Sequence, residues 1–206
     1  MLKREAKQIV GGLSKPSKMP GMAIGLPAKE CKVGSKLAKV AGSVCENCYA
    51  LKGNYKRYEK TIVGAQYKRL EALSHPLWVE AMTTLIKGQD VFRWHDSGDL
   101  QSPEHLEKII QVCKATPETK HWLPTREKKI ISGYKNLLPN NLVVRLSAAM
   151  VGGEPPKSGL NTSTVHKAES LTYHGYECPA YKQGGECGEC RACWDNTIDN
   201  VSYKEH

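Results

Sequence analysis

Apolar residues recur at helical spacing in some stretches of the chain and form short continuous runs in others. Residues 55–73 show helical spacing, and a second helix is predicted over 76–86, with Pro76 in its first turn. A short apolar run at 90–95 predicts a strand that ends in the polar turn DSGDLQS. Ser102 then caps a predicted helix that begins at Pro103.

The second half of the chain contains two more predicted strands. The first covers 120–126 and is followed by a helix that starts near Glu127. The second covers 141–150, where the run LVV is apolar without alternation, as in a sheet covered on both faces. Regular signals weaken after this strand. Residues 1–20 contain paired glycines and KPSKMPG, so we expect them to be extended or loosely held.

Strands that alternate with helices predict an α/β fold with a parallel sheet, either open or a partial (β/α) barrel. A cysteine-rich C-terminal extension follows this core. We assign residues 1–165 to the α/β core, which includes an N-terminal cysteine loop, and residues 166–206 to the cysteine-rich segment packed on it.

Seven of the eight cysteines fall into two groups, which we call the N-terminal and the C-terminal cysteine groups. Thiolates two residues apart can reach one metal centre, so C-x2-C spacing predicts metal ligands. The N-terminal group has the spacing C-x13-C-x2-C and the C-terminal group has C-x8-C-x2-C-x2-C. The predicted ligands are Cys31, Cys45 and Cys48 in the first group, and Cys178, Cys187, Cys190 and Cys193 in the second.

Spacing also favours a type of metal. Three cysteines at i, i+3 and i+6 hold three corners of an iron–sulfur cube in ferredoxins, and Cys178 supplies a fourth ligand. We therefore expect a 4Fe-4S cluster at the C-terminal group, with zinc as the alternative. The N-terminal group has three local thiols, so it either leaves one iron open or is closed by a residue from elsewhere. One composite site from both groups is the remaining alternative.

A disulfide framework is the less favoured interpretation of the cysteines. Disulfides belong to oxidising compartments, and the N-terminal sequence MLKREAKQIVGG has no apolar signal region, so we do not expect secretion. No stretch has the apolar length that spans a bilayer. Cys113 lies in an apolar-periodic stretch and is predicted to be a buried core thiol.

Polar clusters follow each of the three predicted strands. In parallel sheets the functional residues lie at the carboxyl ends of the strands, so we expect these clusters to share one rim with the N-terminal cysteines. The predicted catalytic residues are His95, Asp96, Asp99 and Arg126, and the predicted cofactor-binding residues are Ser97, Gly98, Arg145 and Ser147.

Two sets of motifs resemble known families. Three cysteines before the first helix of a partial barrel resemble radical S-adenosylmethionine enzymes, although the first gap is longer and Asn47 precedes the last cysteine. That resemblance implies a cluster with one iron open to S-adenosylmethionine. A closer resemblance, to the phage gene product 88 family, implies a phage or prophage origin and the cytoplasm of a bacterial host, but no activity. It rests on segments 18–31, 44–55, 93–102, 125–126 and 177–194.

Two functions remain open at this point. In the first, the protein is an enzyme whose N-terminal cluster performs electron-transfer or radical chemistry on an unknown, anionic small molecule. In the second, the metals are structural or redox-sensing, and the net charge of +9 serves to bind nucleic acid or a host protein. Trp94, Trp122, Tyr55 and Tyr58 would then be stacking platforms, although core packing is the favoured role of the tryptophans.

Overall fold

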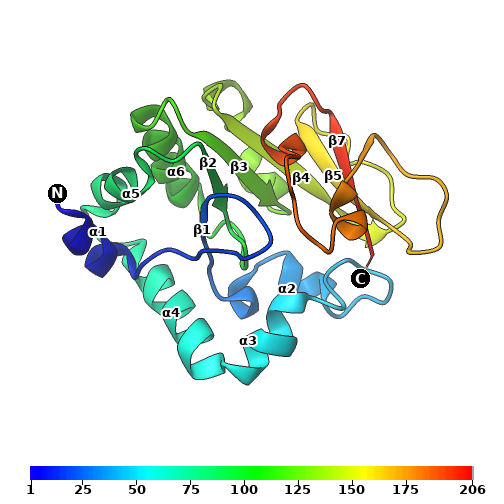
Figure 1. Cartoon of the computed structure of the whole chain (residues 1–206), viewed down its shortest axis with the longest axis horizontal. Helices are drawn as coiled ribbons and strands as arrows, with labels where there is room; N and C mark the ends of the chain where they lie inside the picture. The colour runs from blue at the N-terminus through cyan, green and yellow to red at the C-terminus, as the bar shows by residue number, and fades with distance from the viewer. Residues whose placement is uncertain (206) are drawn as a thin grey trace.

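The computed structural model describes residues 1–205, apart from the side chain of Asn54. Its strands form one sheet in the order β1-β2-β3-β4-β5-β7-β6, and every pair of neighbours is parallel (Figure 1). The sheet is open, with β1 and β6 at its edges. The expected α/β fold with a parallel sheet is therefore confirmed. The strands are β1 (Met22–Ile24), β2 (Val91–Trp94), β3 (Lys120–Thr125), β4 (Leu142–Val151), β5 (Asn161–His166), β6 (Tyr176–Glu177) and β7 (Asn200–Lys204).

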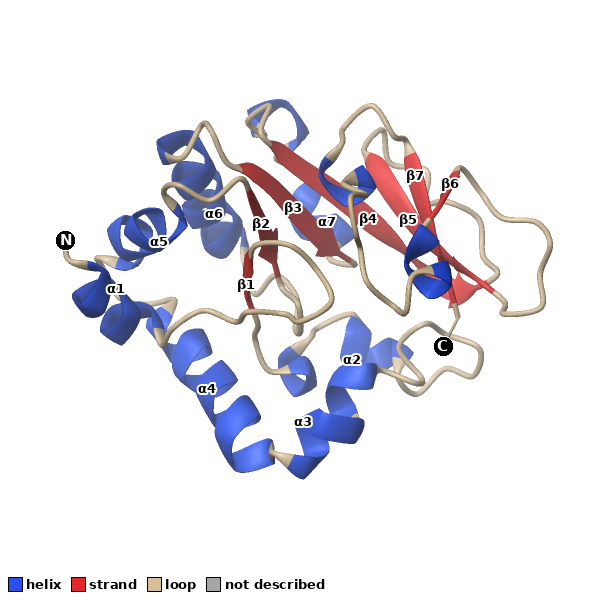
Figure 2. Cartoon of the chain, in the orientation of Figure 1, coloured by secondary structure: helices blue, strands red, loops and turns tan. Residues whose placement is uncertain are grey.

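The helices lie in two places relative to this sheet (Figure 2). α1, α5 and α6 cover one face of its first strands, whereas α2, α3 and α4 lie beyond the carboxyl ends of β1 and β2. None of the described helices is long and apolar enough to cross a membrane. The α-helices are α1 (Lys3–Val10), α2 (Gly34–Leu37), α3 (Gly53–Arg57), α4 (Glu59–Ala72), α5 (Trp78–Ile86), α6 (Pro103–Ala115) and α7 (Lys128–Ile131).

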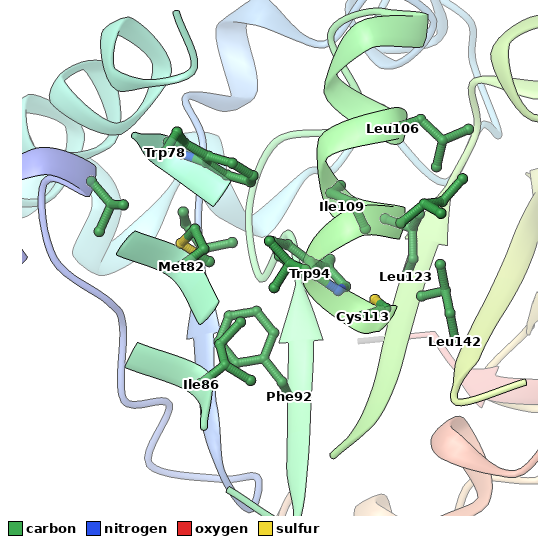
Figure 3. Packing of buried hydrophobic residues seen from close by; sticks show 14 of the residues in the cluster. Trp78, Met82, Ile86, Phe92, Trp94, Leu106, Ile109, Cys113, Leu123 and Leu142 are labelled. Atoms are coloured by element: carbon green, nitrogen blue, oxygen red, sulfur yellow. The ribbon is translucent and has the colours of Figure 1, made fainter. Parts of the chain in front are cut away.

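The larger core fills the space between the sheet and its covering helices. Phe92 and Trp94 point from β2 into this core, where the Trp94 ring contacts both Phe92 and Trp78 of α5 (Figure 3). Cys113 of α6 is fully buried there, as its apolar surroundings in the sequence predicted. Ser102 caps α6 by accepting a hydrogen bond from the His105 N–H, which confirms the predicted start of that helix.

The opposite face of the sheet is covered by the cysteine-rich C-terminal segment. Trp122 of β3 packs edge-on against Trp194, with the ring centroids 5.2 Å apart, and Val201 completes this smaller core. The Trp194 indole Nε1–H donates to the Phe92 carbonyl at 2.9 Å, which fixes the segment to β2. Trp94 and Trp122 are thus core residues, as favoured above.

The structure differs from two of the predicted elements and adds strands after residue 160 that the apolar pattern did not indicate. Residues 3–10 form α1, where an extended chain was expected, because Ala6 and Val10 are fully buried on one side of that helix. The predicted helix 55–73 is divided at Tyr58 into α3 and α4. The expected boundary near residue 165 falls at the end of β5, and β7 and β6 continue the same sheet beyond it.

Candidate metal centres

The N-terminal cysteine loop begins where β1 ends, and the turn after β2 holds its first residues. Leu26 and Ser97 exchange two hydrogen bonds of 2.8 Å, one from the Leu26 N–H to the Ser97 carbonyl and one from the Ser97 hydroxyl to the Leu26 carbonyl. Gly98 has φ of 79°, and a Cβ atom there would lie 2.6 Å from the Leu26 Cβ. Ser97 and Gly98 therefore hold the loop against β1, and the cofactor-binding role predicted for them has no support in these contacts.

Two of the three N-terminal thiols lie near one point beside Gly34. A Cβ atom on Gly34 would lie 3.6 Å from the Cys45 Sγ and 3.7 Å from the Cys31 Sγ, so both sulfur atoms surround the same point. Burial raises the pKa of Cys31 to about 12, and the negative charges of Asp99, Cys48 and Cys45 act in the same direction. Cys31 and Cys45 thus lie on two sides of Gly34, and Cys48 and Asp99 are near enough to affect the pKa of Cys31.

Asp99 joins the carboxyl ends of β2 and β3 beneath this site. Its carboxylate accepts hydrogen bonds from the Thr125 hydroxyl at 2.6 Å, the Leu100 N–H at 2.8 Å and the Arg126 N–H at 2.9 Å. Burial raises the pKa of Asp99 to about 6, although these hydrogen bonds oppose the shift. Asp99 therefore positions Arg126 and has few lone pairs left for a substrate.

Arg126 brings a positive charge to the thiols. Its guanidinium opposes the rise in the pKa of Cys31 and Cys45 that burial causes. The Nε atom of Arg126 is buried, and none of the described residues offers it a hydrogen-bond partner. A buried donor without a partner costs free energy, so this atom marks a place where a ligand oxygen would be stabilised.

Two further contacts hold the cysteine loop. The Glu127 carboxylate is buried and accepts a hydrogen bond from the Val33 N–H at 2.8 Å, just before α2. Beyond α2, the Val44 N–H donates to the Ala149 carbonyl at 2.9 Å, so the loop also joins the end of β4. Glu127 was not among the predicted site residues, although its place directly after Arg126 at a strand end was a signal for it.

Asp96 and Arg93 extend the site toward β1. Burial raises the pKa of Asp96, and the charges of Arg93 and Arg69 oppose this shift. The Asp96 Oδ1 is buried without a partner among the described residues, and a Cβ atom on Gly25 would lie 2.3 Å from it. The Tyr49 hydroxyl, one residue after Cys48, donates to the Asp96 carbonyl. Arg93 was missed, although a charged residue within an apolar strand was a signal.

His95 occupies a different environment from the other residues of its turn. It has φ of 58°, and its ring packs against the His105 ring of α6 at 5.3 Å. Burial lowers the pKa of His95 well below its ordinary value, so the ring is neutral. The structure therefore places His95 in the helix-covered core, and the role of a catalytic base for it has no geometric support.

The C-terminal thiols also share one site, on the sheet face opposite α5 and α6. Burial raises the pKa of Cys187, and the charges of Cys178 and Cys190 add to the shift. The Cys190 Sγ lies 3.5 Å from the Tyr176 hydroxyl, and the Cys193 Sγ lies 3.2 Å from the Tyr203 hydroxyl. The cysteines from 178 to 193 are thus close enough to act together, with two phenols beside them.

Arg145 organises the C-terminal site from below and corrects a prediction. Its side chain is fully buried, and its guanidinium donates to five backbone carbonyl groups at 2.7 to 3.3 Å. These acceptors belong to Thr162, Ala192, Cys193, Asp195 and Ile198. A guanidinium has five N–H donors, so none remains for the cofactor that we expected Arg145 to bind. The Ser147 hydroxyl likewise bonds Ser163, at 3.0 Å.

The cysteines are all free thiols, so the structure contains none of the disulfides considered above. Within residues 1–205, no three His, Cys, Asp or Glu side chains approach as closely as one metal ion requires. Around a single zinc ion, sulfur atoms lie about 3.8 Å apart, since each Zn–S bond is about 2.3 Å. A cluster of several irons holds its thiolates farther apart, because each binds a different corner.

Fold and sites define a class: an α/β protein whose parallel sheet carries two cysteine-rich loops, one at its carboxyl edge and one on a face. The chain belongs to the gene product 88 family, since the family model described as Gene product 88 matches residues 1–196. This match confirms the closer of the two resemblances. No curated protein and no solved structure matches the chain.

Proposed function

We propose that the protein binds iron–sulfur clusters and that its N-terminal cluster is the reactive centre of an enzyme. The observation that carries this proposal is that Cys31 and Cys45 both lie beside Gly34, with Cys48 and Arg126 near enough for their charges to affect the pKa of these two thiols. This group lies at the carboxyl edge of a parallel sheet, where enzymes of such folds place their chemistry.

The donor sets fit clusters of two different kinds. Three thiols in the N-terminal group leave one iron of a cube without a protein ligand, and an open iron is what a reactive cluster needs. Four thiols in the C-terminal group would satisfy every corner, which suits electron relay or a structural role. Thiols must lose their protons to bind metal, and in each group burial and the neighbouring thiols oppose that loss until a cation is present.

The residues near the N-terminal thiols suit a ligand that carries both an anionic group and an ammonium group. Arg126 presents an unpaired buried Nε–H, which would bind a carboxylate or phosphate oxygen. Asp96 presents an unpaired oxygen, which would accept a hydrogen bond from an ammonium group. S-adenosylmethionine carries an amino and a carboxylate group, so we propose it as the first ligand to test, in keeping with the resemblance to radical enzymes.

The first test is the metal content of protein purified without oxygen. Two cubes predict about eight irons and eight sulfides per chain, and a single or composite cube predicts about four. Cys48→Ala should remove the N-terminal share of iron, and Cys190→Ala should remove the C-terminal share. Cys113→Ala is the matched control, because this thiol is enclosed in the larger core. Zinc without iron after anaerobic reconstitution would contradict the proposal. It would favour the alternative, in which the metal is structural and the protein binds nucleic acid or a host protein.

The second test addresses the ligand. Addition of S-adenosylmethionine to the reduced protein should change the electron spin resonance spectrum of the N-terminal cluster, and the change should be absent in Cys48→Ala. Arg126→Met should weaken this effect while the iron content stays at the wild-type value, because Arg126 is a neighbour of the thiols and not a ligand. A spectrum that does not respond to the ligand would refute its binding at the open iron.

A further inference from the structure

A cavity of about 370 Å³ lies between α7 and the loop that joins β4 to β5. Its apolar part is formed by Leu146 of β4, Ile131 of α7 and Leu160, and the first two of these residues are buried. Cavities of about 300 to 1,000 Å³ with a mostly apolar lining are the usual sites of small molecules in proteins. None of the residues proposed above to hold metal or ligand lines this cavity.

Three ammonium groups face this apolar lining. Lys128, Lys135 and Lys157 all line the cavity, and no carboxylate does. The Lys128 Nζ donates to the Lys157 carbonyl at 3.3 Å, and the Lys135 Nζ donates to the Ser158 carbonyl. These two contacts hold the loop against α7 and keep both charges at the cavity. Each ammonium has three N–H donors, so donors remain for a ligand.

The loop itself adds backbone donors. Gly159 has φ of 67°, in the left-handed region, and it follows Ser158 near the end of the loop, just before β5. Within the part of the chain that the structure describes, the N–H groups of these two residues donate no hydrogen bond. Consecutive free N–H groups in a turn of this kind form a concave site for an anion. The same loop therefore supplies both charge and directed donors.

We propose that this cavity binds the phosphate group of a small amphipathic molecule, such as a nucleoside phosphate. The phosphate oxygens would contact the ammonium groups and the free N–H groups of the loop tip. The organic part would lie against Leu146 and its apolar neighbours. A phosphate contributes about two negative charges near neutral pH. A cavity lined by three lysines and no carboxylate therefore suits a phosphate better than it suits a neutral ligand.

The test is calorimetric titration of the full-length protein with adenosine diphosphate, inorganic pyrophosphate and a 12-nucleotide DNA strand. Lys157→Glu is the first variant, because the Lys157 ammonium makes no hydrogen bond among the described residues and its loss breaks no contact of the fold. Lys114→Glu is the control, since this exposed lysine of α6 is remote from the cavity lining and changes the net charge equally.

We expect adenosine diphosphate to bind, Lys157→Glu to weaken binding about tenfold, and Lys114→Glu to leave it unchanged. If the DNA strand binds more tightly and shows the same difference between the variants, the phosphate comes from a polynucleotide and the site stands. Absence of binding by all three probes would overturn the proposal, as would equal weakening in the two variants. Iron content should be the same in all three proteins, which separates this result from the cluster proposal.

Discussion

Replacement of Arg145 by methionine should destabilise the protein by about 4 kcal/mol and detach the C-terminal cysteine loop. Methionine keeps much of the side-chain volume but removes all five hydrogen bonds to carbonyl groups. Three of the acceptors, in Thr162, Ala192 and Cys193, belong to buried residues. Each buried acceptor left without a partner costs about 1 to 3 kcal/mol.

Two effects reduce the total cost of these unpaired acceptors. Removal of the buried guanidinium recovers part of the cost of taking its charge out of water, which amounts to several kcal/mol. The loop 192–198 can also open and return its outer carbonyl groups to water, because Asp195 and Ile198 are only partly buried. Three unpaired acceptors would cost about 3 to 9 kcal/mol in all, and the recovered charge-burial cost brings the expected net loss to about 4 kcal/mol.

The assay is urea unfolding under reducing conditions, followed by circular dichroism, together with iron analysis of the purified variants. Arg145→Lys should recover less than half of the loss, because an ammonium cannot reach five acceptors in one plane. Arg4→Met, in the exposed face of α1, should change the free energy of unfolding by less than about 0.5 kcal/mol. A loss below about 1 kcal/mol in Arg145→Met, with full iron content, would refute the reasoning.

Three more predictions concern other contacts. The free energy of unfolding should fall as the pH drops from about 6.5 to 4, because burial lowers the pKa of His121 to about 4 and the unfolded chain takes up the proton first. In urea unfolding, His121→Gln should reduce this fall by about 3 kcal/mol over that range. An unchanged fall would exclude His121 as its origin. Glu127→Ala should free the Val33 N–H and speed proteolysis between residues 32 and 43, whereas Glu127→Gln, which keeps an acceptor, should not; equal rates for both variants would show that this contact is dispensable. Gly98→Ala should lower the free energy of unfolding by about 2 kcal/mol or more, because its Cβ would overlap Leu26 and its φ is left-handed; wild-type stability in thermal unfolding would show that the turn relaxes easily.

The apolar pattern predicted β2, β3 and β4 within about one residue because their side chains enter hydrophobic cores. It missed β5 and β7, in which buried polar side chains satisfy one another. The Thr162 hydroxyl donates to the Asn200 side-chain oxygen at 2.8 Å, and the Asn200 amide donates to the Thr164 hydroxyl at 2.9 Å. Strands stabilised in this way carry no apolar period, so hydrophobic spacing could not reveal them.

The sequence was sufficient to predict where the site lies in the fold, but not which role each of its residues has. A parallel sheet brings all strand ends to one edge, so the cluster of Asp96, Asp99 and Arg126 near the N-terminal cysteines followed from topology. Sequence spacing does not tell whether a polar side chain at such an end faces a ligand or a backbone group. Ser97 and Arg145 were therefore assigned to a cofactor, whereas both bind carbonyl groups of the cysteine loops.

The polar residues at the N-terminal site differ in whether their buried polar atoms already have hydrogen-bond partners, and this difference indicates which of them could bind a ligand. Glu127 and Arg145 form their hydrogen bonds with the loops that carry the cysteines, and Asp99 forms its own with the ends of β2 and β3. The fold needs these bonds whether or not the protein binds a ligand. Arg126 and Asp96 differ from these residues, because each has a buried polar atom without a hydrogen-bond partner among the described residues. Arg126 lies near enough to Cys31 and Cys45 to affect their pKa values, and the Asp96 carbonyl accepts a hydrogen bond from Tyr49, next to Cys48. The proposed ligand would therefore present an anionic group to Arg126 and a hydrogen-bond donor to Asp96.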